Sequence, residues 1–383
     1  MKPIHMVDLK GQYLKIKNEI DAAVAGVLDT TSFIGGPQVT EFSKNLAKYL
    51  GVTHVIPCAN GTDALQIAMM ALGLQPGDEV ITPSFTYIAT TEVIALLKLK
   101  PVFAEVNTKT FCIDPDAIRK AITPKTRAIV PVHLYGQSCE MEEIMAIANE
   151  HNLYVIEDNA QSIGSDYTFK NGDVKKTGNI GTISCTSFFP SKNLGCYGDG
   201  GALCTNDDEL AVKLKMIANH GQRARYYHDI VGCNSRLDAL QAAILNIKLP
   251  LLDQYIDARI NAAEFYDKAF ADNKHLATPF RADYSKHVFH QYTVILENIE
   301  NPERFRDGLV AYLAEKEVPA MIYYPVPAHR QKMFASFGGS DFQLEKTDWL
   351  THRVFSLPIH TELDNEQLDY ITKSVLEYVK QHS

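Results

Sequence analysis

The chain has 383 residues, of which 46% are hydrophobic and 22% are charged, and its formal net charge is −9. This length and composition are typical of a globular protein with two domains. The negative charge argues against nucleic acid as the main partner. The sequence contains no run of 18 apolar residues and no apolar leader at the N-terminus. We therefore expect a cytoplasmic protein that has no membrane partner.

The chain contains seven cysteines, an odd number, and no CxxC pair or zinc-type spacing occurs among them. Free cysteines in folded proteins are mostly buried and behave as small apolar residues. We therefore expect reduced thiols and no metal site. A catalytic cysteine is the less common alternative.

The first two thirds of the chain alternate between strand and helix patterns. The predicted strands are 54–61, 78–85, 100–106, 127–136, 153–162, 181–189 and 200–206, and the predicted helices are 62–74, 90–99 and 141–152. The strands are short continuous apolar runs, which is typical of strands buried on both faces of a parallel sheet. The sequence therefore predicts an α/β domain over residues 1–250, with a mostly parallel central sheet.

The pattern changes after residue 250. Long helices are predicted over 255–272, 302–317 and 364–381, and a strand is predicted over 291–298. Asp364 and Gln367 have the spacing of a capping pair at the start of the last helix. Residues 251–383 are therefore expected to form a smaller α+β domain.

Our interpretation of the chemistry starts from Lys192. It lies in "FFPSKNLGCYGDGG", between two phenylalanines and a loop rich in glycine. Apolar surroundings favour the neutral amine of a lysine, and a neutral amine attacks aldehydes. The more common alternative for a single lysine is a side chain whose ammonium group reaches solvent.

Asp158 and Gln161 follow a predicted buried strand in "VIEDNAQSIG". A carboxylate there needs a partner, and the protonated ring nitrogen of pyridoxal phosphate (PLP) is a suitable one. Gln161 lies one turn further on, within reach of a ring substituent. The alternative is that the acidic residues cap the following turn.

Two further motifs end at the same edge of the sheet. In "CANGTDAL", Gly61 and Thr62 lie between a strand and a helix, where N–H groups bind an anion, and the hydroxyl of Ser187 is expected nearby. An ordinary turn is an equally good interpretation of this motif alone. In "TPSFTYIAT", an aromatic, either Phe85 or Tyr87, would stack on a planar ring, although core packing is the more common role.

These motifs converge at the edge where parallel sheets bind ligands, which makes their combination more specific than any one of them. With "IGGPQVTEFSKNLAKYLGV", "GCNSRLDALQAAIL", "YYPVP" and "SLPIH", they cover nearly the whole chain. On these motifs the sequence resembles the DegT/StrS family of nucleotide-sugar aminotransferases. The resemblance implies the fold of aspartate aminotransferase, PLP as cofactor and a homodimer with shared active sites.

The resemblance also implies roles for individual residues. Lys192 carries the cofactor, Asp158 pairs with its ring nitrogen, and Gln161 lies near its ring hydroxyl. The phosphate ligands are Gly61, Thr62 and Ser187, with Asn234 reaching in from the neighbouring subunit. Tyr87 covers the ring, with Phe85 as the second choice. The implied substrate ligands are Arg236, which suits a sugar carboxylate, and less strongly Tyr324, His220 and Ser191.

The implied reaction moves an amino group from glutamate to a keto nucleotide sugar. The most similar stretches point to C3 of a UDP-linked 3-oxo-glucuronate in O-antigen biosynthesis. A 3-keto or 4-keto deoxysugar on UDP or dTDP is the alternative within the family. A PLP-binding regulator without catalysis is the alternative from another class. A non-PLP nucleotide-binding protein is disfavoured, because neither a P-loop nor GxGxxG occurs.

Overall fold

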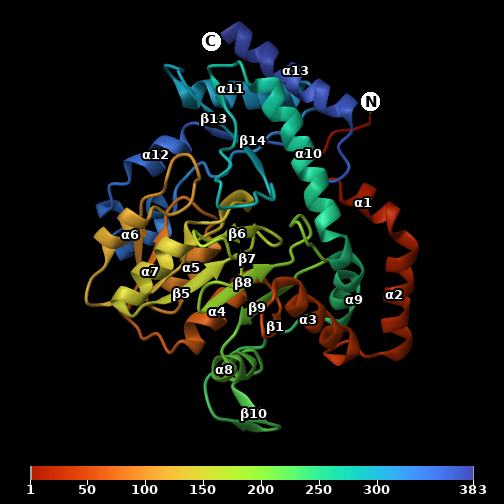
Figure 1. Cartoon of the computed structure of the whole chain (residues 1–383), viewed down its shortest axis with the longest axis vertical. Coiled ribbons are helices and arrows are strands. Elements are labelled where there is room, and N and C mark those ends of the chain that lie inside the picture. The colour runs from red at the N-terminus through yellow and green to blue at the C-terminus, as the bar shows by residue number, and fades with distance from the viewer. Residues whose placement is uncertain (1, 383) are drawn as a thin grey trace.

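The computed structural model describes residues 2–382 and is built around a seven-stranded sheet in the order β1-β9-β8-β5-β4-β2-β3 (Figure 1). The strands are β1 (His54–Cys58), β2 (Glu79–Pro83), β3 (Lys100–Ala104), β4 (Thr126–Ile129), β5 (Tyr154–Asp158), β8 (Ile183–Ser187) and β9 (Gly201–Thr205). β9 is antiparallel to both of its neighbours, and the pairs from β8 to β3 are parallel. The predicted α/β fold with a mostly parallel sheet is confirmed.

Helices cover both faces of this sheet. They are α3 (Gly36–Leu50), α4 (Gly61–Ala71), α5 (Ala89–Leu96), α6 (Pro115–Ala121), α7 (Met141–His151), α8 (Asp208–Ala218) and α9 (Ala239–Lys248), and α2 (Lys17–Thr30) packs on α9 outside this layer. Apolar residues of α4, α5 and α8 form one core with Ile56, Ile156 and Leu203. Their strand neighbours Val55 and Val155 pack on the opposite face, in cores formed with α3 and α9 and with α6 and α7. Each strand is thus buried on both sides.

The C-terminal part of the chain surrounds a second core. Its three-stranded antiparallel sheet consists of β12 (Leu276–Ala277), β13 (Tyr292–Leu296) and β14 (Val354–Leu357). Its helices are α10 (Leu252–Phe270), α11 (Pro302–Glu315), α12 (Glu345–Thr351) and α13 (Asn365–His382). The first residues of α10 pack in the core that α3 and α9 form with the large sheet, and its last residues pack in this second core. Helix α10 therefore connects the two cores. The domain boundary at residue 250 stays a prediction.

Several elements differ from those predicted. The predicted strand 127–136 ends at Ile129, shortly before Pro131, which has no N–H for the ladder, and Tyr135 then turns the chain through a positive φ of 59°. The helical segment of α1 (Leu9–Lys15), α2 and α3 was not predicted. Two short hairpins complete the fold: β6 (Asp166–Thr168) with β7 (Val174–Lys176), and β10 (Gln222–Ala224) with β11 (Tyr227–His228). Within residues 2–382, no helix is long and apolar enough to span a membrane.

Candidate active site

The predicted phosphate turn lies where β1 ends and α4 begins. The side chain of Asn60 caps α4, since its Oδ1 accepts the N–H of Asp63 at 2.8 Å. Gly61 opens the helix against β8, and a Cβ atom there would lie 2.8 Å from the Cβ of Ser187. The structure therefore brings Gly61, Thr62 and Ser187 together. The first N–H groups of a helix have no partner within it and favour an anion, so these residues fit a phosphate.

Asp158 ends β5 at the same edge of the sheet and is 6% exposed. Its Oδ2 accepts a hydrogen bond from the Thr90 hydroxyl at 2.7 Å, and its Oδ1 accepts the N–H of Ala160 at 3.1 Å. These donors suit a charged carboxylate.

The preceding Glu157 has a structural role at a distant loop, whereas in the following turn, which was the alternative for this motif, the N–H of Ala160 donates to Asp158. Its carboxylate accepts the N–H groups of Gly178, Ile180 and Gly181 and contacts His133 at 2.9 Å. Burial alone would raise the pKa of Glu157, but these hydrogen bonds hold it below its ordinary value. Neighbouring residues of β5 thus serve two purposes, because successive side chains point to opposite faces of a strand.

Lys192 lies in a tight loop between β8 and β9. The N–H of Lys192 donates to the carbonyl of Phe189, and that of Cys196 donates to the carbonyl of Phe188. Burial lowers the pKa of Lys192 to about 8, and the charge of Asp158 opposes only part of this effect. The interpretation of Lys192 as a lysine with an available neutral amine therefore agrees with its surroundings. Ser191 is its partly buried neighbour.

Gln161 and Tyr324 lie together although they are far apart in sequence. The Oε1 of Gln161 accepts the N–H of Tyr135 at 2.8 Å, and its Nε2 donates to the Tyr324 hydroxyl at 3.1 Å. The ring of Tyr324 lies 6.4 Å from that of Tyr87, which is 58% exposed. Phe85 is fully buried and stacks on Phe111, so this second choice for the cofactor aromatic is a core residue.

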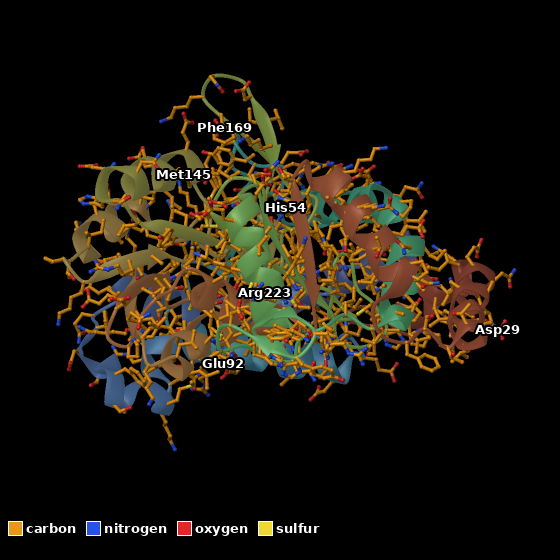
Figure 2. The ribbon with its side chains drawn as sticks, turned by 90° about the horizontal axis from the view of Figure 1, so that it is seen from below. Asp29, His54, Glu92, Met145, Phe169 and Arg223 are labelled. Carbon is orange, nitrogen blue, oxygen red and sulfur yellow. The ribbon has the colours of Figure 1, made fainter. Side chains whose placement is uncertain are left out.

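Asn234 and Arg236 flank Ser235, which packs beside the phosphate turn: its hydroxyl donates to the side chain of Asp63 at 2.6 Å and accepts the N–H of Ala59 at 3.0 Å. Arg236 donates to the side chains of Asn234 and, at 2.8 Å, Asn219. Within residues 2–382, no hydrogen bond or ion pair joins Arg236 to Lys192, Asp158 or Gln161. His220 is exposed and precedes the β10–β11 hairpin, which projects from the body of the protein beneath α8 (Figure 1). Figure 2, viewed from below, shows Arg223 on this hairpin.

Two residues near the site were not predicted. Thr90 bonds directly to Asp158, and its only sequence signal is the helical spacing of the hydroxyl residues Thr86 and Thr90. The Nδ1 atom of His290 is buried and has no partner within residues 2–382. Burial, helped by the charges of Lys192 and Arg259, holds the pKa of His290 well below its ordinary value, so the ring is neutral. No local pattern indicates this position.

Comparison with known proteins identifies the class. Residues 14–376 match the model of the DegT/DnrJ/EryC1/StrS aminotransferase family. A Pseudomonas aeruginosa protein named UDP-2-acetamido-2-deoxy-3-oxo-D-glucuronate aminotransferase is 46% identical over 96% of this chain and 98% of its own. A Geobacillus stearothermophilus protein named pleiotropic regulatory protein is 45% identical over 98% of this chain and 99% of its own. The structure of Streptomyces venezuelae DesV with a ketimine intermediate matches with a TM-score of 0.93 and 37% identity over 99% of both chains.

The fold and these matches define a PLP-dependent aminotransferase that acts on sugars. The chain belongs to the DegT/DnrJ/EryC1/StrS aminotransferase family.

Proposed function

We propose that this enzyme transfers the amino group of glutamate to C3 of UDP-2-acetamido-2-deoxy-3-oxo-glucuronate, in the biosynthesis of a lipopolysaccharide O-antigen or related surface polysaccharide. The observation that carries the chemistry is the pKa of about 8 for Lys192, at the sheet edge that also holds Asp158. The substrate is inferred from the similar P. aeruginosa protein, whose name specifies this keto sugar and an aminotransferase. A regulator without catalysis does not need an activated lysine at this position.

The residues of the site fit PLP. The turn at Gly61, Thr62 and Ser187 suits its phosphate, because a Cβ at Gly61 would fill the space between α4 and β8. Asp158 suits its ring nitrogen, and Gln161 has an amide within reach of a ring substituent. When bound, PLP supplies an aldehyde for amines to attack and a ring that withdraws electrons from the reacting carbon.

Each residue then has a distinct task in the proposed mechanism. Lys192 holds the cofactor until the donor replaces it, and its freed amine then moves the proton of the donor's α-carbon. Asp158 keeps a proton on the ring nitrogen by offering a negative charge to it. Tyr87 covers one face of the ring. The same groups act in reverse order when the keto sugar accepts the amino group.

We also propose a cytoplasmic homodimer with shared active sites. Asn234 and Arg236 are exposed, and within residues 2–382 no hydrogen bond joins them to Lys192, Asp158 or Gln161, which is expected if they serve the site of a partner. The nearby hairpin and the residues that follow it expose apolar side chains, among them Tyr226 and Val231, which is 84% exposed. Exposed apolar side chains of this kind favour a protein contact. Arg236 of the partner would then grip the sugar carboxylate with two hydrogen bonds.

The test of the amino transfer is the visible absorption of the purified protein with PLP, before and after glutamate. We expect a yellow band that glutamate bleaches and that the correct keto sugar restores. A band that glutamate leaves unchanged would identify another donor or a regulator. The absence of any band with added PLP would contradict the role of Lys192.

The test of the substrate compares the turnover of the UDP-linked 3-keto sugar acid with that of a matched 6-deoxy sugar. If Arg236 binds the carboxylate, the sugar acid reacts faster, and Arg236→Gln reduces this preference. Equal turnover of both sugars in the wild-type protein would favour the deoxysugar alternative, in which Arg236 holds the diphosphate.

A further inference from the structure

We propose that Thr90 is a positioning residue that keeps Asp158 in the charged form needed to pair with the protonated ring nitrogen of PLP. The inference rests on the proposed function, in which Asp158 is the partner of this nitrogen. It adds a residue that acts through Asp158 and does not touch the cofactor itself.

The contact between the two side chains is short and buried. The Thr90 Oγ1 lies 2.7 Å from the Asp158 Oδ2, and Thr90 is 1% exposed. A charged carboxylate can only accept hydrogen bonds, so Thr90 is the donor. Within residues 2–382, the hydroxyl of Thr90 and the N–H of Ala160 are the donors to this side chain. Each carboxylate oxygen therefore has one donor and retains a free acceptor position.

The surroundings of Thr90 support this direction of the hydrogen bond. The hydroxyl of Thr86, also buried, lies 3.5 Å from that of Thr90. Since Thr90 gives its proton to Asp158, Thr86 is the residue that can donate to Thr90 in turn. Thr90 also stands in the first turn of α5, where a helix carries partial positive charge that favours an anion.

The consequence for the chemistry follows from proton sharing. A carboxyl group and a pyridine nitrogen share one proton, either as a neutral pair or as a carboxylate with a pyridinium. Donors to the carboxylate favour the charged pair, because they stabilise its anion. Without Thr90 the proton moves toward Asp158, and the ring withdraws electrons less strongly.

A purely structural role, in which the hydroxyl only fastens α5 to β5, makes a different prediction. Three variants separate the two roles. Thr90→Val removes the hydroxyl at nearly constant shape, and Thr90→Ser restores it. Thr91→Val is the matched control, because Thr91 is the next residue of α5, is also buried, and donates to the carbonyl of Ile88 at 2.9 Å.

The experiment titrates the cofactor-free protein with PLP and with 1-deaza-PLP, which has carbon in place of the ring nitrogen. We expect Thr90→Val to raise the dissociation constant of PLP about tenfold, as for the loss of one charge-assisted hydrogen bond. Thr90→Ser and Thr91→Val should bind PLP like the wild-type protein. With 1-deaza-PLP, Thr90→Val and the wild-type protein should bind equally.

Other outcomes overturn the inference. If Thr90→Val weakens the binding of PLP and of 1-deaza-PLP equally, Thr90 has only a structural role. If PLP binding is unchanged, Thr90 has no role. Thr90→Ala replaces Thr90→Val if the latter does not fold. If the wild-type protein binds both cofactors equally, the pairing of Asp158 with the nitrogen fails, and the role of Thr90 fails with it. This experiment measures only cofactor binding and does not involve glutamate. A failure of glutamate to react would therefore refute the proposed amino transfer and not the inference about Thr90.

Discussion

The acidity of Lys192 sets the pH at which the protein takes up its cofactor. The pKa of Lys192 is about 8, compared with 10.5 for an ordinary lysine. At pH 7 about one Lys192 amine in ten is therefore neutral, whereas for an ordinary lysine the fraction is about one in 3,000. The rate of PLP uptake by the cofactor-free protein should therefore rise about tenfold per pH unit below pH 8 and level off above it.

Stopped-flow absorbance measures this rate, with butylamine in the same buffers as a control for the titration of PLP itself. A rate that levels off only above about pH 10, like that of an ordinary lysine, would contradict the lowered pKa.

Replacing Lys192 tests its role in proton transfer. We expect Lys192→Ala to lower the rate of amino transfer by about 10³-fold or more, because the residue is both the attachment point and the base. A small primary amine in the buffer should restore part of the rate by acting as the base. Lys213→Ala, at an exposed position of α8, is the control and should keep the wild-type rate. Normal turnover by Lys192→Ala would refute the proposal.

At the scale of elements, the junction of β1, α4 and β8 determines how tightly the phosphate is held. A Cβ atom at Gly61 would lie 2.8 Å from that of Ser187, so Gly61→Ala must push α4 away from β8. We expect its dissociation constant for PLP to rise by about tenfold or more, since several phosphate hydrogen bonds lengthen together.

Gly26→Ala is the matched control for this variant. Gly26 lies in α2 and a Cβ atom there would meet no atom within 4 Å. It should bind PLP normally and gain about 0.5–1 kcal/mol of stability, because alanine favours the helix. Thermal unfolding with and without PLP separates the two effects. Normal cofactor affinity in Gly61→Ala would contradict the phosphate turn.

The sheet could be predicted from the sequence because its strands are buried on both faces. Strands β1, β2, β3, β5, β8 and β9 each fall within a predicted strand, and the residues after all of them except the antiparallel β9 reach one edge. The first three helices were missed. Few residues of α1 and α2 are buried, so their apolar pattern is weak, but Phe42, Leu46 and Leu50 of α3 recur at helical spacing and were a signal that could have been used. Local pattern also did not separate Phe85, which packs in the core, from the exposed Tyr87.

Local sequence pattern could not predict the contacts between distant parts of the chain. Thr90 meets Asp158 across 68 positions, and Gln161 meets Tyr324 across 163. These pairs depend on how α5 and the segment before α12 dock on the sheet. A tertiary arrangement of this kind leaves no periodicity in either segment. The sequence did predict Lys192, Asp158 and Gly61 as candidates, because each lies in a local motif whose residue types indicate a chemical role.

At the scale of the whole molecule, the proposed dimer gives a role to predicted ligands that, within residues 2–382, form no hydrogen bond with Lys192, Asp158 or Gln161 of their own chain. Asn234 and Arg236 bond to each other and to Asn219, next to the projecting hairpin. In a symmetric dimer, the same surface of each subunit can complete the site of the other. A single chain would then hold two incomplete halves of two different sites.

Mixing two inactive variants tests this arrangement. We expect the Lys192→Ala and Asn234→Ala proteins each to be inactive or weak alone. In a mixed dimer, Lys192 of one subunit and Asn234 of the other form one intact site. Refolding the two together in equal amounts makes half of the dimers mixed, each with one working site of two, so the activity should return to about a quarter of the wild-type value. Lys192→Ala refolded with a Lys192→Ala, Asn234→Ala double variant is the control and should stay inactive. If the first mixture stays as inactive as this control, although light scattering finds dimers, then Asn234 serves the site of its own chain.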